Sequence, residues 1–69
     1  MSNIVISKKF HDGMFFVQVN GGDEVEVHPS SWNDPSQRAS IIAAELGVEP
    51  QPWMGELGDE QRTELETDL

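Results

Sequence analysis

Three short stretches near the start of the chain have the composition of β-strands. They cover residues 4–10, 14–20 and 24–28, and each is rich in β-branched and aromatic residues. Turns containing glycine separate them, first at Gly13 and then at Gly21 and Gly22. Because short turns join antiparallel strands, the pattern predicts a three-stranded antiparallel β-meander.

The apolar positions also predict how this sheet is buried. In the third stretch Val25 and Val27 alternate with polar residues, which is typical of a strand with one covered and one wet face. The second stretch, MFFVQVN, is apolar on both faces and is expected to be central, with some cover on its second side. Its register stays open, because a two-residue turn places Gln18 opposite Val25, whereas a loop of odd length places Val19 there.

A helix is predicted over residues 35–46. Asp34 precedes Pro35 as an N-cap, and Gly47 follows as a residue that can end the helix in a left-handed conformation. The apolar residues between them recur at helical spacing and predict one stripe that packs on the sheet: Ala39, Ile42, Ala43 and Leu46.

Two further helical segments are expected after residue 50. Residues 53–57 can form one or two turns before Gly58 interrupts them. Residues 59–68 predict an acidic helix that docks through Leu57, Leu65 and Leu69. The predicted fold is therefore a single α+β domain, with a three-stranded antiparallel β-meander over residues 1–28 and two or three α-helices over residues 34–69 packed on one face.

Composition restricts what a chain of 69 residues can do. Its length does not favour a deep enzymatic cleft, and the absence of cysteine excludes disulfides and thiolate metal sites. No apolar run is long enough to span a membrane or to form the core of a signal peptide. We therefore expect a cytoplasmic protein, a monomer, without a cofactor.

The charge of the chain points to a class of partner. Thirteen acids against four bases give a net charge of −9. Nucleic acid and anionic lipid are bound through lysine and arginine, so direct binding to either is not expected. A basic protein surface is the partner that this charge favours.

No group of residues predicts catalysis or metal binding. His11 and His28 belong to no ligand motif, and the serines have no adjacent base. An exposed acidic tail gives all its carboxylates similar surroundings, which does not suit acid–base catalysis. The protein is expected not to be an enzyme.

The acids gather towards the C-terminal end of the chain. On the predicted helix Glu60, Glu64 and Asp68 lie on one stripe, with neighbours about 5 to 6 Å apart. Duplex DNA presents one charge per about 1.7 Å of axis, so such a stripe approximates a patch of phosphates. The alternative is a solvated helix face. The expected partner-binding residues are Glu45, Glu49, Trp53, Glu56, Asp59, Glu60, Glu64, Glu66 and Asp68.

The two tryptophans differ in their expected roles. Trp32 lies between the predicted sheet and helix and is expected in the core. Trp53, between two prolines and a glycine, fits a core position and an interface position equally well.

The chain resembles phage-encoded anti-CRISPR proteins in its size, its acidity, its lack of cysteine and its order of sheet before helices. It is most similar to those acting on type I-C interference complexes. The resemblance covers the whole chain and rests on these features and on the acidic region from Glu45 to Asp68. It implies a stoichiometric inhibitor that mimics DNA and occupies the basic nucleic-acid-binding surface of a Cas (Cascade-type) protein in the cytoplasm of an infected bacterium.

A second resemblance covers residues 15–20. FFVQVN is similar to the second strand of MbtH-like proteins, small activators of adenylation enzymes that also have three strands followed by helices. That family has a Ser-Leu-Trp-Pro type stretch after the turn, whereas this chain reads EVEVHPSSWNDP, with Trp32 later and no proline after it. The resemblance implies an accessory protein that binds and activates an adenylation enzyme, as the alternative function.

Overall fold

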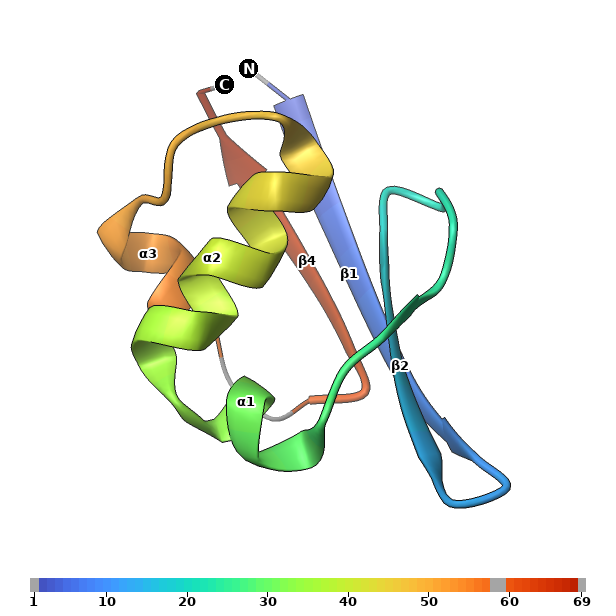
Figure 1. The fold of residues 1–69 in the computed structure, drawn as a ribbon. Coiled ribbons are helices and arrows are strands. Elements are labelled where there is room, and N and C mark those ends of the chain that lie inside the picture. The colour runs from blue at the N-terminus through green and yellow to red at the C-terminus, as the bar shows by residue number, and fades with distance from the viewer. Residues whose placement is uncertain (1, 58–59, 69) are drawn as a thin grey trace.

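The computed structural model of the chain describes residues 2–57 and 60–68 (Figure 1). In these residues four strands form one antiparallel sheet in the order β3-β2-β1-β4, and three helices cover one of its faces. The predicted α+β class and the meander of the first three strands are confirmed. The elements are β1 Ser2–His11, β2 Met14–Val19, β3 Val25–Glu26, α1 Pro29–Asn33, α2 Pro35–Leu46, α3 Pro52–Gly55 and β4 Arg62–Thr67.

Two tight turns use residues with positive φ angles. Asp12 and Gly13, with φ of 51° and 78°, connect β1 to β2 in the left-handed conformation that a two-residue hairpin turn requires. Asn20, with φ of 54°, turns the chain after β2, and its side-chain oxygen accepts a hydrogen bond of 2.9 Å from the Val5 amide. The predicted turns are therefore in place, and the second one is also bonded to β1.

The register between β2 and β3 differs from both arrangements considered from the sequence. Val17 lies opposite Val25, in place of Gln18 or Val19. The connection is a longer loop of odd length, so the two valines share the covered face of the sheet. No described helix covers the second face, and Phe16 is half-buried there between its cross-strand neighbours.

The helix predicted over residues 35–46 is confirmed as α2. The Asp34 carboxylate accepts a hydrogen bond of 2.9 Å from the Ser36 amide, which caps the first turn. Gly47 ends the helix with φ of 71°, and the Val48 amide bonds back to the Ala43 carbonyl at 3.0 Å. Local chemistry therefore determines both ends of this helix.

Residues 62–67 are a strand, so the acidic helix predicted over residues 59–68 is wrong. As β4 they pair antiparallel with β1, with Leu65 opposite Ile4 and Glu64 opposite Val5. A helix here would bury only a thin apolar stripe, whereas the strand satisfies the backbone groups along the second edge of β1. The sheet consequently has a fourth strand, and both described ends of the chain lie side by side in it (Figure 1).

The core lies between the sheet and the helices. The predicted α2 stripe is confirmed, with Leu46 at its partly buried margin. Trp32, from the unpredicted short helix α1, is 3% exposed, which confirms its place in the core. Among the residues that the structure describes, twelve apolar side chains are buried: Ile4, Ile6, Phe15, Val17, Val19, Val27, Trp32, Ala39, Ile42, Ala43, Met54 and Leu57.

A buried arginine in α2 connects the helices of this layer through hydrogen bonds. The Arg38 side chain donates from Nε to the Trp32 carbonyl at 2.8 Å, and from Nη1 to the carbonyls of Gly55 and Leu57. These carbonyls lie at or beyond the ends of α1 and α3, where helical backbone acceptors have no partner within the helix. One of the four bases of the chain therefore serves the interior of the protein.

Candidate functional site

The acids of β4 lie on the face of the sheet that no described helix covers, here called the open face. Along the strand Arg62, Glu64 and Glu66 are exposed, while Thr63 and Leu65 are half-buried on the other face. This alternation places every second side chain of β4 on the open face. Glu64 and Glu66 thus form an exposed pair on one strand.

The predicted stripe of Glu60, Glu64 and Asp68 does not exist as a helical ladder. Glu60 precedes β4, Asp68 follows it, and only Glu64 of the three lies within the strand. Four residues of extended chain span about 13 Å, roughly twice the spacing of the helical stripe. All three side chains are exposed, and the Thr63 hydroxyl donates to the Glu60 carboxylate at 3.5 Å.

The other predicted contact residues belong to the helical layer. Glu45 in α2, Glu49 in the following loop and Glu56 after α3 are exposed. Trp53 is half-buried and packs against the core, so it has features of both roles considered for it. Asp59 lies outside the described residues. The described contact residues are therefore divided between the helical layer and the region of β4, and the part predicted as an acidic helix is the part that differs.

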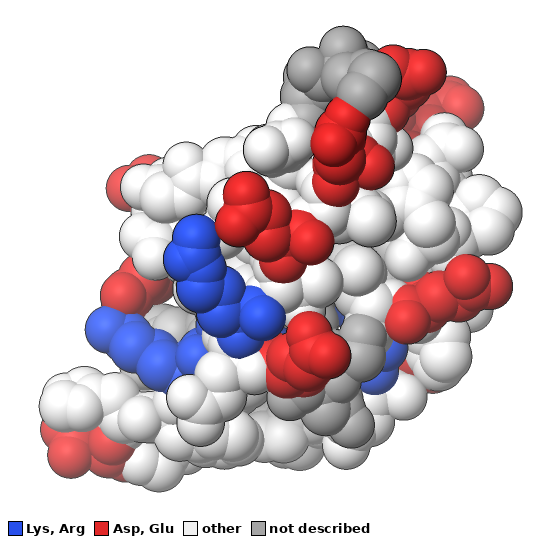
Figure 2. All heavy atoms as spheres, turned by 180° about the vertical axis from the view of Figure 1, so that it is seen from behind, with Lys and Arg blue, Asp and Glu red and all other residues white. Residues whose placement is uncertain are grey.

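The bases of the open face lie close to acids. Lys9 Nζ is 2.7 Å from a carboxylate oxygen of Glu24, and Arg62 Nη2 is 3.8 Å from one of Glu64. Figure 2 shows this side of the molecule, with blue side chains among red ones. Both pairs are solvent-exposed, so each contributes little to stability, and each partly offsets the charge of its base and of its acid, Glu64 included.

The outer edge of β4 carries unpaired backbone groups. Lys8 and Gln61 face each other in the β1–β4 ladder, and the Lys8 amide bonds to the Gln61 carbonyl at 2.8 Å. Since bonding directions alternate along a strand, the amides and carbonyls of Arg62, Glu64 and Glu66 point away from β1. β4 is an end strand of the sheet, so in the described part of the chain these groups have no neighbouring strand.

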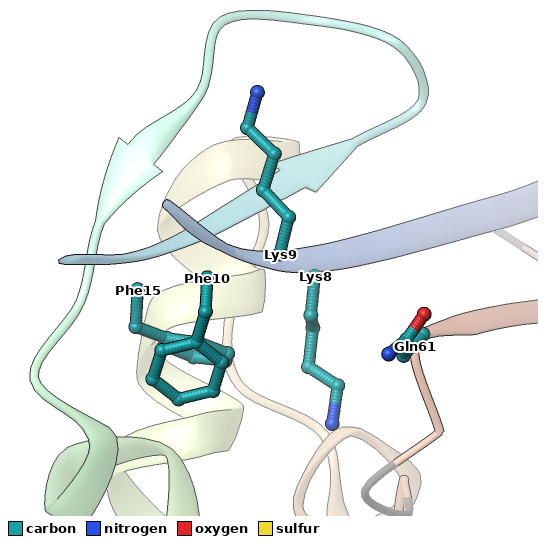
Figure 3. A pocket seen from close by; sticks show the side chains of 5 residues that line it. All are labelled: Lys8, Lys9, Phe10, Phe15 and Gln61. Atoms are coloured by element: carbon teal, nitrogen blue, oxygen red, sulfur yellow. The ribbon is translucent and has the colours of Figure 1, made fainter. Parts of the chain in front are cut away.

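A hollow beside the first hairpin is a further feature that was not predicted from the sequence (Figure 3). It has a volume of about 420 Å³ and is lined by Lys8, Lys9, Phe10, Phe15 and Gln61. Phe10, near the end of β1, is 67% exposed, and its ring centroid lies 4.9 Å from that of Phe15. Its place beside the turn, where few elements can cover it, was the signal available in the sequence.

Both lysines of the chain line this hollow, on different faces of β1. Figure 3 shows Lys8 on the side of the phenylalanines and Lys9 on the opposite side of the strand. Lys8 Nζ lies 5.1 Å from the centroid of the Trp32 ring, within the range of a cation–π contact. The hollow therefore combines exposed aromatic surface with positive charge.

The histidines have local partners. His28 caps α1, because its Nδ1 accepts from the Ser30 amide at 3.3 Å, and His11 Nε2 lies 3.2 Å from the carboxylate of its neighbour Asp12. Among residues 2–57 and 60–68 no three histidines or acids are grouped as metal ligands would be. Within the same residues, no helix has the length and apolar character needed to cross a membrane.

Comparison with known proteins gives no match: no protein-family model fits the chain, no curated protein is detectably similar to it, and no solved structure is detectably similar either.

Proposed function

We propose that the protein is a stoichiometric inhibitor of a bacterial CRISPR effector, which it binds at a basic nucleic-acid-binding surface of the Cascade-type complex and thereby excludes target DNA. It acts without catalysis and without a cofactor, as a monomer, in the cytoplasm of a bacterium infected by a phage. The observation that carries this proposal is the distribution of charge. The described acids of the C-terminal region, Glu60, Glu64, Glu66 and Asp68, are exposed, whereas Arg38 is buried and Lys9 and Arg62 lie close to acids on the open face.

The strand geometry changes which acids act as phosphate substitutes. Glu64 and Glu66 are two residues apart on β4, so their side chains follow each other at about 6.8 Å along the strand. One strand of DNA carries a charge per about 3.4 Å of axis, so this pair follows every second phosphate. In this proposal Glu64 and Glu66 form the centre of the contact and Glu60 and Asp68 extend it.

Competition with target DNA tests the proposal. A purified type I-C effector complex is mixed with labelled target DNA, with and without this protein, at several salt concentrations. We expect loss of DNA binding that weakens as salt rises, because contacts between exposed charges are screened. Unchanged DNA binding at every salt concentration would contradict the proposal.

A charge-matched pair of variants separates the surface from the net charge. Glu64→Lys with Glu66→Lys changes the open face, while Glu45→Lys with Glu49→Lys makes the same change of charge in the helical layer. We expect the first variant to lose at least about tenfold in competition, a difference of about 1.4 kcal/mol, and the second to lose clearly less. Equal losses would show that net charge alone is responsible.

The alternative is an activator of an adenylation enzyme. The FFVQVN stretch lies in β2, and the order of three strands before the helices agrees with that family. Trp32 is buried and presents little surface to a partner, so exposed Phe10 is the residue that would have to replace its contact. Stimulation of a purified adenylation enzyme, lost on Phe10→Ser, together with no effect on the CRISPR effector, would favour this function.

A further inference from the structure

The two edge strands of the sheet, β3 and β4, differ in how much of their backbone is available for pairing with a further strand. β3 has two residues and leads at once into α1, so little of that edge is available for pairing. β4 has six residues and lies at the opposite end of the sheet. Long edge strands accept further strands unless side chains prevent it, so the chemistry of β4 decides what can pair there.

The residues of β4 whose backbone amides and carbonyls point away from β1 are also its charged residues. Arg62, Glu64 and Glu66 offer their amides and carbonyls to a further strand, and their side chains lie together on the open face. A second copy of β4 paired antiparallel, with Arg62 opposite Glu66, would place Glu64 directly opposite its own counterpart. Like charges directly opposite each other are destabilising, but the same pairing sets two Arg62–Glu66 pairs of opposite charge against this one contact. Pairing of side chains therefore does not exclude a second copy at this edge, and the net charge of −9 on each copy is what opposes it.

We propose that the free edge of β4 takes up an extended basic segment of the partner protein as a fifth strand. This inference rests on the proposed function, since it names how a basic partner is held. Lysine or arginine at alternate positions of the segment lies opposite Glu64 and Glu66, and backbone hydrogen bonds fix its direction. The residues between the basic ones lie on the side of Thr63, Leu65 and Thr67 and are small or β-branched.

A synthetic peptide tests the edge directly. The probe is a short, capped peptide with lysine at the two alternate positions that lie opposite Glu64 and Glu66, threonine opposite Arg62, and threonine or valine between them. The control is the same peptide with its lysine amides N-methylated, which keeps the charge but removes the donors that would face β4. Binding is followed by the NMR amide signals and amide hydrogen exchange of the full chain.

We expect the unmodified peptide to shift and protect the amides of Arg62, Glu64 and Glu66. The N-methylated peptide should bind about tenfold more weakly, since it loses backbone hydrogen bonds but no charge. Equal binding of the two peptides would overturn strand pairing while leaving the acidic surface, and hence the proposed function, intact. Binding of neither peptide would also overturn the inference, and the DNA competition experiment would then decide the proposed function separately.

A variant of the protein gives an independent test. Glu64→Pro removes an amide that points away from β1, so the β1–β4 ladder keeps its bonds, and proline is tolerated on edge strands in this orientation. Glu64→Gln is the control, because it removes the charge but keeps the amide. We expect the proline variant to lose clearly more peptide affinity than the glutamine variant. The thermal midpoint of unfolding is measured for both variants as a control for folding.

Self-association is the competing use of this edge. If the protein alone sediments as a dimer and the amides of Arg62, Glu64 and Glu66 become protected as its concentration rises, the edge pairs with a second copy and the inference is overturned. A monomer with exchanging edge amides supports it.

Discussion

The covered and the open face of the sheet come from the same strands and have opposite chemistry. On β1 the side chains of Ile4 and Ile6 are buried under the helices, whereas Asn3 before them and Lys9 after them are exposed and Val5 between them is half-buried. On β4 half-buried Leu65 lies between exposed glutamates in the same way. The alternation separates the residues that stabilise the fold from those that can bind a partner, so the two sets can be changed independently.

The covered face should respond most strongly to a loss of volume. Ile42 in α2 is fully buried against the sheet, so Ile42→Ala should lower the free energy of unfolding by about 2–5 kcal/mol. Chemical denaturation measures the change. Ile41→Ala is the matched control, because Ile41 is only partly buried, and we expect a clearly smaller loss. Equal losses would mean that the two faces of α2 are not distinguished as the structure shows.

Arg38 should matter more than Arg62 although both carry the same charge. Arg38→Met leaves the carbonyls of Trp32, Gly55 and Leu57 without this donor, which should cost roughly 2–3 kcal/mol of unfolding free energy. Arg62→Met removes an exposed pair with Glu64 and should cost less than about 1 kcal/mol. Thermal unfolding of both variants checks the order, and the reverse order would refute the structural role of Arg38.

Gly55 tests how closely α3 packs on the start of α2. A Cβ atom at this position would meet the carbonyl oxygen of Pro35 at 2.8 Å. Gly55→Ala should therefore destabilise by about 1–3 kcal/mol, because one of the two helices has to shift. Glu56→Ala at the next, exposed position should have little effect. Denaturation curves of the two variants that coincide would contradict this close contact.

The open face should give the smallest change in stability. Glu64→Lys with Glu66→Lys alters exposed side chains of an edge strand, and we expect each substitution to change the unfolding free energy by no more than about 0.5 kcal/mol. Circular dichroism and a thermal melt measure this. A large destabilisation would show that the open face carries stability as well, and the loss of DNA competition by this variant would then have to be corrected for unfolding.

The exposed acids of the candidate site could be predicted from the sequence, but their arrangement in space could not. Charge alone predicted that Glu60, Glu64, Glu66 and Asp68 are exposed, because unpaired carboxylates are rarely buried. The predicted spacing of these acids was wrong, because it depends on whether the segment is a helix or a strand. The exposure of Phe10 was indicated only by its place beside the turn, because an apolar residue at the end of a strand is buried or exposed according to what packs there.

The elements whose signals are local follow from the amino-acid sequence alone. The cap at Asp34, the apolar stripe and Gly47 act within one helix, and the turn at Asp12 and Gly13 acts within one hairpin, so α2 and the β1–β2 pair follow from neighbouring residues. RTELET has no such signal, because Leu65 suits a helical stripe through Leu69 as well as an alternation with Thr63.

That this last segment is a strand depends on the sheet that it joins. β1 has a second edge whose amides and carbonyls need partners, and the C-terminal segment supplies them from the far end of the chain. Pairing between such distant segments is determined by the assembled sheet and not by local propensity. Because of this pairing, the acids that were predicted to lie along a helix lie instead in and beside an edge strand.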